Sequence, residues 1–380
     1  MKRIASLDML RGYALVCIML DHMPIGALRA FTLTNFVVFD AAELFVLLSG
    51  FLVGMVWIKV EARQGLEAAR KRFYRRAFEV WRALIVGAII LALLSALLFH
   101  FGLKHTAVWS EYANMIMQNP LGYVATVALM WMQPNLLDVL ALYVLLIVSV
   151  PVTVPLLLRH PRWFMVASIA LWFAAVKLNS MIPNQTGPGL LFNPFGWQLL
   201  FFFGVGIGAF RDQLLIALHP YRRWLTIAAW AMTIFGAAIV FSWKVGDVGK
   251  PLSDALHAIT GDVDKWSLDL VRFLGVVAAT WLVVEPLAPA FDWMANTAAG
   301  RALADIGRGG LLSFVACVLL SIFGDAMDML APKNSLGLWL RVGIDIWVIL
   351  VLWLVSALWL RRHELLSNLG GPRPGSPSRG

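Results

Sequence analysis

Ten apolar segments follow one another along the chain, and most have the length that a helix needs to cross a lipid bilayer. A transmembrane helix requires about 20 largely apolar residues. The segments cover residues 9–28, 36–58, 78–99, 136–158, 163–179, 196–210, 224–243, 269–287, 309–327 and 336–360. The 380-residue chain is 60% hydrophobic and only 14% charged, whereas soluble domains are about 25% charged. We therefore predict an all-α polytopic membrane protein with about ten transmembrane helices.

The distribution of basic residues predicts the orientation of these helices. Ten spans place both termini on the same side of the membrane. The opposite side then holds nine basic residues, which are Arg29, Lys104, Lys177, Lys244, Lys250, Lys265, Arg272, Lys333 and Arg341. The other 22 of the 31 Lys and Arg residues lie on the side of the termini. Because Lys and Arg are enriched in cytoplasmic loops, we predict that both termini are cytoplasmic.

The domain organisation is simple. Residues 1–365 are predicted to form one transmembrane domain, and residues 366–380, rich in Pro, Gly and Ser, a disordered cytoplasmic tail. The apolar segment 117–133 is bracketed by Pro120 and Pro134, which favours an interfacial or re-entrant piece over an eleventh span.

The first predicted helix carries ionisable residues at depths where charge is costly and usually functional. Arg11 and His22 are eleven positions apart, so they share a helix face and are separated by roughly 16 Å along the axis. We hypothesise that Arg11 meets an anionic donor from the cytoplasm and that His22 performs proton transfer or nucleophilic chemistry further in. The alternative is a His22 hydrogen-bonded between helices and an Arg11 that reaches out to the interface.

Acidic residues near His22 are candidates for assisting it. Glu43 is predicted to lie at a similar depth in the second helix and to act as an acid/base partner or an orienting group. Asp21 could orient the imidazole through water or cap the end of the first helix. For Asp40 we favour the capping of a helix N-terminus.

Candidates for binding a sugar substrate lie on the outer side of the membrane. Asp138 lies at the start of the fourth predicted helix, on that side. It could contact the substrate, or it could cap the helix N-terminus. Asn193 and Trp197 could bind a sugar, because amides hydrogen-bond and indole rings stack. Trp is also enriched at membrane interfaces, so most of the 17 tryptophans must be interface residues.

A basic cluster follows the second predicted helix and comprises Arg70, Lys71, Arg72, Arg75 and Arg76. The spacing of Arg72 and Arg75 places two guanidinium groups on one helical face, and arginines bind phosphate in a bidentate manner. This indicates a site for the phosphates of a cytosolic nucleotide-type donor. The alternative is ordinary positive-inside anchoring of the membrane domain. The sequence has no P-loop or zinc motif, so neither ATP-driven nor metal chemistry is predicted.

The chain resembles the OpgC-type membrane acyltransferases, relatives of the acyltransferase-3 group, in RIASLDMLRGYALVCIMLDHM (3–23) and FDAAELFVLLSGFLVG (39–54). A third specific block is FNPFGWQLLFFFGVGIG (192–208). Weaker matches cover residues 134–146, 264–274 and 304–315. One departure is Gly309-Gly310, where the pattern leads us to expect a polar residue and a serine.

The resemblance implies O-acyl transfer to an extracytoplasmic glycan in the bacterial cytoplasmic (inner) membrane. For OpgC members the product is succinylated osmoregulated periplasmic glucan. The acyl donor is expected to be cytosolic succinyl-CoA, and no permanently bound cofactor is expected. Related acyltransferases use an Arg and a His of the first helix and an Arg-x-x-Arg pair. At the matching positions this chain has Arg11, His22, Arg72 and Arg75.

These considerations assign catalysis to His22, Glu43 and Asp21. Donor binding is assigned to Arg11, Lys71, Arg72, Arg75 and Arg76, and acceptor binding to Asp138, Asn193 and Trp197. Two alternative functions stay open. One is O-acetyl transfer to another cell-surface polysaccharide, and the other is proton-coupled secondary transport through intramembrane ionisable residues. Transporters often show paired halves with broken helices, and the sequence shows no such internal symmetry.

Overall fold

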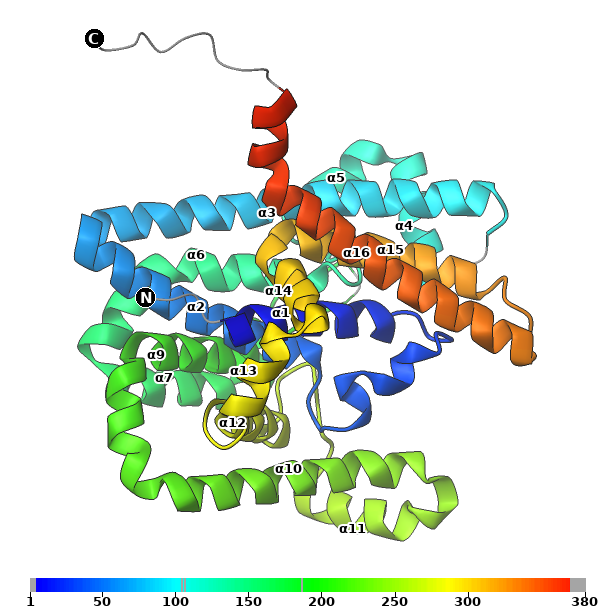
Figure 1. Cartoon of the computed structure of the whole chain (residues 1–380). Coiled ribbons are helices and arrows are strands. Elements are labelled where there is room, and N and C mark those ends of the chain that lie inside the picture. The colour runs from blue at the N-terminus through cyan, green and yellow to red at the C-terminus, as the bar shows by residue number, and fades with distance from the viewer. Residues whose placement is uncertain (1–4, 104, 106, 186, 370–380) are drawn as a thin grey trace, which may run out of the picture.

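The computed structural model describes residues 5–369 except 104, 106 and 186, and the regular elements of this part are all helices (Figure 1). The longer helices are α1 (Ala5–Asp21), α2 (Ala41–Gln64), α3 (Leu66–His100), α6 (Asp138–Arg159), α9 (Pro194–Leu218), α10 (Arg222–Lys244), α12 (Leu270–Val284), α15 (Leu311–Asp328) and α16 (Ser335–Leu369). The shorter helices are α4 (Ala107–Gln118), α5 (Pro120–Ala128), α7 (Pro161–Phe173), α8 (Ala175–Asn179), α11 (Lys250–Thr260), α13 (Ala288–Asn296) and α14 (Ala298–Gly309).

Each of the ten predicted spans overlaps a helix, but fewer helices are long and apolar enough to cross a bilayer unaided. Six stretches of the described chain meet that requirement, one of which joins α9 and α10, and the bent pair α12 and α13 makes a seventh. α1 has 17 residues and α7 has 13, which is short of the about 20 that a straight span needs. The protein is therefore an all-helical, multi-pass membrane protein, while ten spans and cytoplasmic termini stay predictions.

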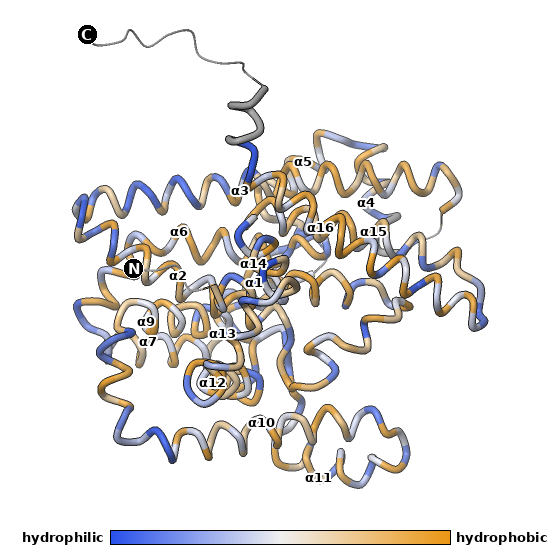
Figure 2. Tube along the Cα trace, viewed as in Figure 1, coloured by the Kyte–Doolittle hydropathy of each residue, from blue (hydrophilic) through white to orange (hydrophobic). Residues whose placement is uncertain are grey.

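Hydrophilic residues mark one end of the bundle. The connections from α2 to α3 and from α9 to α10 lie at this same end (Figure 1), and blue, hydrophilic residues gather in both (Figure 2). Gly65 separates α2 from α3 with a φ of 86°, a conformation that glycine adopts without a steric penalty. The basic cluster follows directly in α3, so this is the end that we predict to face the cytoplasm.

α1 is enclosed by other helices, because it contacts α2, α14 and α15. Its residues 14–20 are all buried. A Cβ atom at Gly12 would overlap the carbonyl oxygen of Leu303, so α14 lies directly on the backbone of α1. Close packing against these helices fixes the rotation and depth of α1. The positions of Arg11 in its first half and of His22 just after its end are therefore set by packing.

Glycines also bring α2 and α9 to backbone contact. A Cβ atom at Gly50 or Gly54 would overlap a carbonyl oxygen of α9, and one at Gly208 would overlap the carbonyl oxygen of Phe51 in α2. Small residues allow helices to approach closely in membranes. This contact fixes the N-terminal ends of α2 and α9, which both contribute to the site described below.

The structure bears on two predicted segment boundaries. The apolar segment 117–133 is broken at Asn119 and contains α5, which has nine residues and packs on α3, so it is too short to span. α16 continues to Leu369, so helix extends into the predicted tail 366–380, and residues 370–380 lie outside the described residues. Gly310, in the departure from the family pattern, has a φ of 62° and separates α14 from α15.

The contact between α2 and α9 predicts opposite effects for two glycines of the same helix. Gly208→Ala forces a methyl group against the α2 backbone, and such overpacking costs about 1–3 kcal/mol. The matched control is Gly206→Ala, because no atom lies within 4 Å of the added Cβ. We expect Gly208→Ala to lower the Tm of the detergent-solubilised protein by several degrees, and Gly206→Ala to leave it unchanged or raised. Equal Tm values for both variants would contradict this packing.

Candidate active site

His22 lies directly after the C-terminal end of α1 and is partly buried. Its Nδ1 atom is 2.7 Å from the carbonyl oxygen of Ile18, one turn earlier. A carbonyl oxygen can only accept a hydrogen bond, so Nδ1 carries the proton. In the neutral ring, Nε2 then holds a lone pair that can accept a proton or attack an electrophile. The charges that act on this imidazole include those of Lys265, Asp40 and Arg29.

Asp21 has other partners than the His22 ring. Its Oδ1 accepts a hydrogen bond from Thr32 Oγ1 at 2.6 Å, and its Oδ2 accepts one from Thr34 Oγ1 at 2.8 Å. These bonds hold the segment between α1 and α2, which includes the 3₁₀ helices η1 (Leu28–Phe31) and η2 (Leu33–Asn35). The carboxylate thus ties the loop that follows His22 to the end of α1.

Asp40 and Glu43 form a capping box at the N-terminus of α2. Asp40 Oδ1 accepts from the Ala42 amide at 2.8 Å, and the Asp40 amide donates to Glu43 Oε2 at 3.1 Å. This arrangement satisfies backbone donors that a helix N-terminus otherwise leaves unpaired. The capping role predicted for Asp40 is confirmed. Glu43 is fully buried and shares in the cap.

Two basic residues from a distant segment complete a charged cluster, which comprises Asp40, Glu43, Lys265 and Arg272. Nε and Nη2 of Arg272 both lie 2.5 Å from Glu43 Oε1. Arg272 Nη2 is also 3.5 Å from Asp40 Oδ2, and Lys265 Nζ is 2.6 Å from the same oxygen. Burial alone lowers the pKa of the Lys265 ammonium, but the carboxylates of Asp40 and Glu43 outweigh it and raise this pKa. Lys265 therefore stays charged at neutral pH.

Hydrogen bonds hold the segment that carries Lys265 against α9. The carbonyl oxygen of Trp266 accepts from the Trp197 indole at 3.0 Å and from the Asn193 amide at 2.9 Å. Asn193 also caps α9 through its side chain, and Trp197 is fully buried. Leu268 is held at a φ of 60°, a strained conformation for a leucine that persists only where its surroundings impose it. Two of the three residues predicted to bind the acceptor, Asn193 and Trp197, thus position the Lys265 segment.

Asp138 is the first residue of α6 and is buried. Its Oδ1 accepts from the Val139 amide at 2.8 Å, so it satisfies one backbone amide of the first turn, while Leu137 holds the N-cap position. The charge of Lys265 acts on this carboxylate as well. Lys265 is thus a basic residue whose charge reaches both His22 and Asp138.

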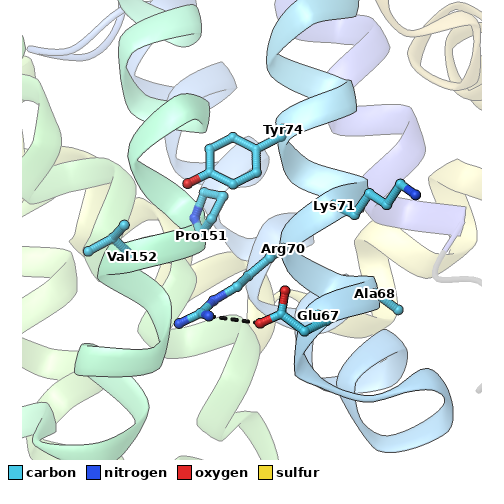
Figure 3. A pocket seen from close by; sticks show the side chains of 7 residues that line it. All are labelled: Glu67, Ala68, Arg70, Lys71, Tyr74, Pro151 and Val152. Carbon is cyan, nitrogen blue, oxygen red and sulfur yellow. Dashed lines mark hydrogen bonds and ion pairs between the residues drawn. The ribbon is translucent and has the colours of Figure 1, made fainter.

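The basic cluster lies on the first turns of α3. Arg70 and Lys71 line a shallow hollow of about 690 Å³ that faces α6. Figure 3 shows Arg70 and Tyr74 reaching from α3 toward Pro151 and Val152 of α6, with Arg70 paired to Glu67 at 2.9 Å.

The other residues predicted to bind the donor do not line this hollow. Arg72 and Arg75 are exposed, and Arg75 and Arg76 pair with Glu79 at 3.2 and 3.3 Å. Arg11 lies on α1, 3.9 Å from Asp8, rather than on α3. Donor binding by these residues stays a prediction.

Sequence reasoning missed Lys265 and Arg272, which entered only the count of outer basic residues. A signal for Arg272 was present, because it falls inside the predicted span 269–287 and charges at that depth are usually functional. Lys265 had no comparable signal, since it precedes that span in a polar loop.

Comparison with known protein families gives one finding. The model of a family described as OpgC protein matches residues 3–364, which is nearly the whole chain. No curated protein matches the chain.

The charged cluster predicts that Arg272 is important for stability. Arg272→Met leaves Glu43 buried without its cation, and breaking a buried pair in this way costs about 3–5 kcal/mol. The matched control is Arg222→Met, because the pair of Arg222 with Glu285 has an arginine side chain that is 55% exposed. Exposed pairs contribute about 0–1 kcal/mol. We expect thermal unfolding in detergent to show a large loss for Arg272→Met and a small one for Arg222→Met, and similar losses would refute a buried role.

Proposed function

Because the chain belongs to the OpgC family, which implies a membrane acyltransferase, we propose that it transfers a succinyl group from cytosolic succinyl-CoA to hydroxyl groups of a periplasmic glucan. The observation that carries the proposal is the hydrogen bond from His22 Nδ1 to the Ile18 carbonyl oxygen, 2.7 Å long. It orients the ring and leaves the Nε2 lone pair for chemistry. A carbonyl of the preceding turn thus takes the orienting place that a carboxylate holds in a hydrolase triad.

In direct transfer, Nε2 accepts the proton of a glucan hydroxyl while the hydroxyl oxygen attacks the thioester carbon. The carbon–sulfur bond then breaks, and the imidazolium returns the proton to the departing thiolate, so CoA leaves as a free thiol. In a two-step route, Nε2 itself attacks the thioester carbon, the carbon–sulfur bond breaks and CoA leaves as a thiolate. The glucan hydroxyl oxygen then attacks the acyl carbon, the carbon–nitrogen bond breaks to restore the neutral ring, and the hydroxyl proton passes to the CoA thiolate. Both routes use the same nitrogen of His22, which contacts the hydroxyl proton in direct transfer and the reacting carbon in the two-step route.

The donor is proposed to bind from the basic end of the bundle. The phosphates of CoA carry several negative charges, which the cluster on α3 matches with Arg70, Lys71, Arg72 and Arg75 on neighbouring turns. Arg11 lies on α1, and His22 follows the C-terminal end of this helix. The eleven positions between Arg11 and His22 correspond to about 16 Å along the helix axis. A thin acyl-pantetheine arm alongside α1 would bring the thioester to His22.

The glucans of a deletion strain test this proposal. We expect mass spectrometry to show that the succinyl-sized mass is lost on deletion, returns with the wild-type gene and stays absent with His22→Ala. General acid–base catalysis contributes about 10²–10⁴-fold, so succinylation should fall at least 100-fold. The matched control is His160→Ala, because His160 is exposed after α6 and its loss should not affect succinylation.

Two outcomes would overturn parts of the proposal. Wild-type levels of succinylated glucan with His22→Ala, in a protein that is present in the membrane, would remove His22 from catalysis. Unchanged glucans in the deletion strain, with acetylation lost from another surface polysaccharide, would replace both the donor and the acceptor. An acyl group trapped on His22 and released by hydroxylamine would select the two-step route.

A further inference from the structure

A succinyl donor brings a second carboxylate into the protein, and this inference rests on the proposed function. An acetyl group has no such charge. Within an apolar bundle, an unpaired carboxylate is strongly unfavourable, so a site for a dicarboxylic acyl group needs a cation near the reacting carbon. The question is which basic residue of this chain can supply it.

The charged cluster contains one cation with free surface. The side chain of Lys265 is 29% exposed, whereas those of Arg272 and Glu43 are 11% and 0% exposed. Arg272 is enclosed and directed at Glu43. An ammonium group has three donors, and the contact of Lys265 Nζ with Asp40 Oδ2 occupies one of them. Lys265 can therefore bind a further anionic group without breaking its pair with Asp40.

Lys265 also lies close enough to His22 for its charge to act on the imidazole. A donor that enters along α1 from the basic end presents its thioester carbon to His22 first, so the far end of the acyl chain extends beyond His22. Lys265 contacts Asp40 at the start of α2 and acts electrostatically on both His22 and Asp138. The terminal carboxylate of a short dicarboxylic acyl group would point toward this ammonium.

The position of the Lys265 ammonium is well defined. Its Nζ lies 5.3 Å from the ring centroid of Trp266 and 5.7 Å from that of Phe192, within the range of cation–π attraction. Asp264 accepts hydrogen bonds from the amides of Trp266 and Ser267 at 2.9 Å, which fixes the turn. A rigid cation loses less entropy when it binds a ligand.

Other basic residues on this side fit the role less well. Arg29 also acts on His22, but it is exposed on η1, where water competes for a carboxylate. Lys244 is exposed and already donates to the carbonyl and side-chain oxygens of Asn35 at 2.9 and 2.6 Å. Asp138 is acidic and is therefore no candidate for binding a carboxylate, and its Oδ1 already accepts a hydrogen bond from the Val139 amide.

We propose that Lys265 binds the free carboxylate of the donor acyl group and thereby makes the enzyme selective for dicarboxylic acyl-CoA over acetyl-CoA. Lysine suits this role because its ammonium is a compact point charge that can contact Asp40 and the ligand at once. Asp40 and Trp197 act as positioning residues, since they hold Lys265 and its segment in place.

The test compares donor binding in the purified full-length protein. The probes are succinyl-CoA, acetyl-CoA and the neutral amide analogue succinamoyl-CoA, which has nearly the shape of succinyl-CoA without its charge. We expect the wild type to bind succinyl-CoA at least about tenfold more tightly than succinamoyl-CoA, because the lost contact is a charge-assisted hydrogen bond. Lys265→Gln should abolish this preference, and Lys265→Arg should restore part of it. The matched control is Lys250→Gln, which removes an exposed charge from the same side.

The outcomes separate this inference from the proposed function. Equal binding of succinyl-CoA and succinamoyl-CoA by the wild type would overturn the role of Lys265, whether or not its variants fold. The role of Lys265 would also be overturned if the Lys265→Gln protein kept the preference for succinyl-CoA, or if its affinity for all three probes fell equally. If the wild type binds acetyl-CoA and succinyl-CoA with equal affinity, the proposed acyl transfer is retained and the carboxylate site is refuted. If it binds no CoA ester at all, the proposed function itself fails.

Discussion

Charge that is buried in an apolar bundle must be paired, and the charged cluster meets this requirement where several helix ends converge. Asp40 and Glu43 satisfy the N-terminus of α2, and Arg272 and Lys265 supply the cations. The bond between Arg272 and Glu43 joins residues 229 positions apart, so it ties α2 to α12. The close packing of α1 places His22 within the field of this cluster. Chemistry and architecture thus depend on the same ion pairs.

Much of the fold could be predicted, because its determinants are local. The length of apolar segments predicts helices, and the spacing of Arg11 and His22 places them on one face of α1. Capping is local as well, since it needs only an acid or amide before a helix, so the expected cap at Asp40 was found in place. Membrane crossing was harder, because α1 and α7 are shorter than a straight span and depend on their neighbours.

The contacts that assemble the candidate site could not be predicted from local patterns. Lys265 and Arg272 reach Asp40 and Glu43 only after the whole chain has folded. Trp197 was expected to meet a sugar, but its indole donates to the backbone beside Lys265. Such long-range hydrogen bonds leave no periodic signal in the sequence. The charge of Arg272 inside an apolar segment was the available indication, and it pointed to a buried partner without identifying it.

The central claim is that the Nε2 atom of His22 faces the reacting carbon of an acyl donor that enters from the basic end of α3. An electron cryomicroscopy structure with a thioether analogue of succinyl-CoA, which cannot transfer its acyl group, tests this most directly. We expect the acyl carbonyl carbon next to Nε2, at about 3.5 Å if the ring attacks it and one hydroxyl group further away if the transfer is direct, with the CoA phosphates among the arginines of α3. An acyl group bound away from His22, or a nucleotide bound at the opposite end of the bundle, would contradict it.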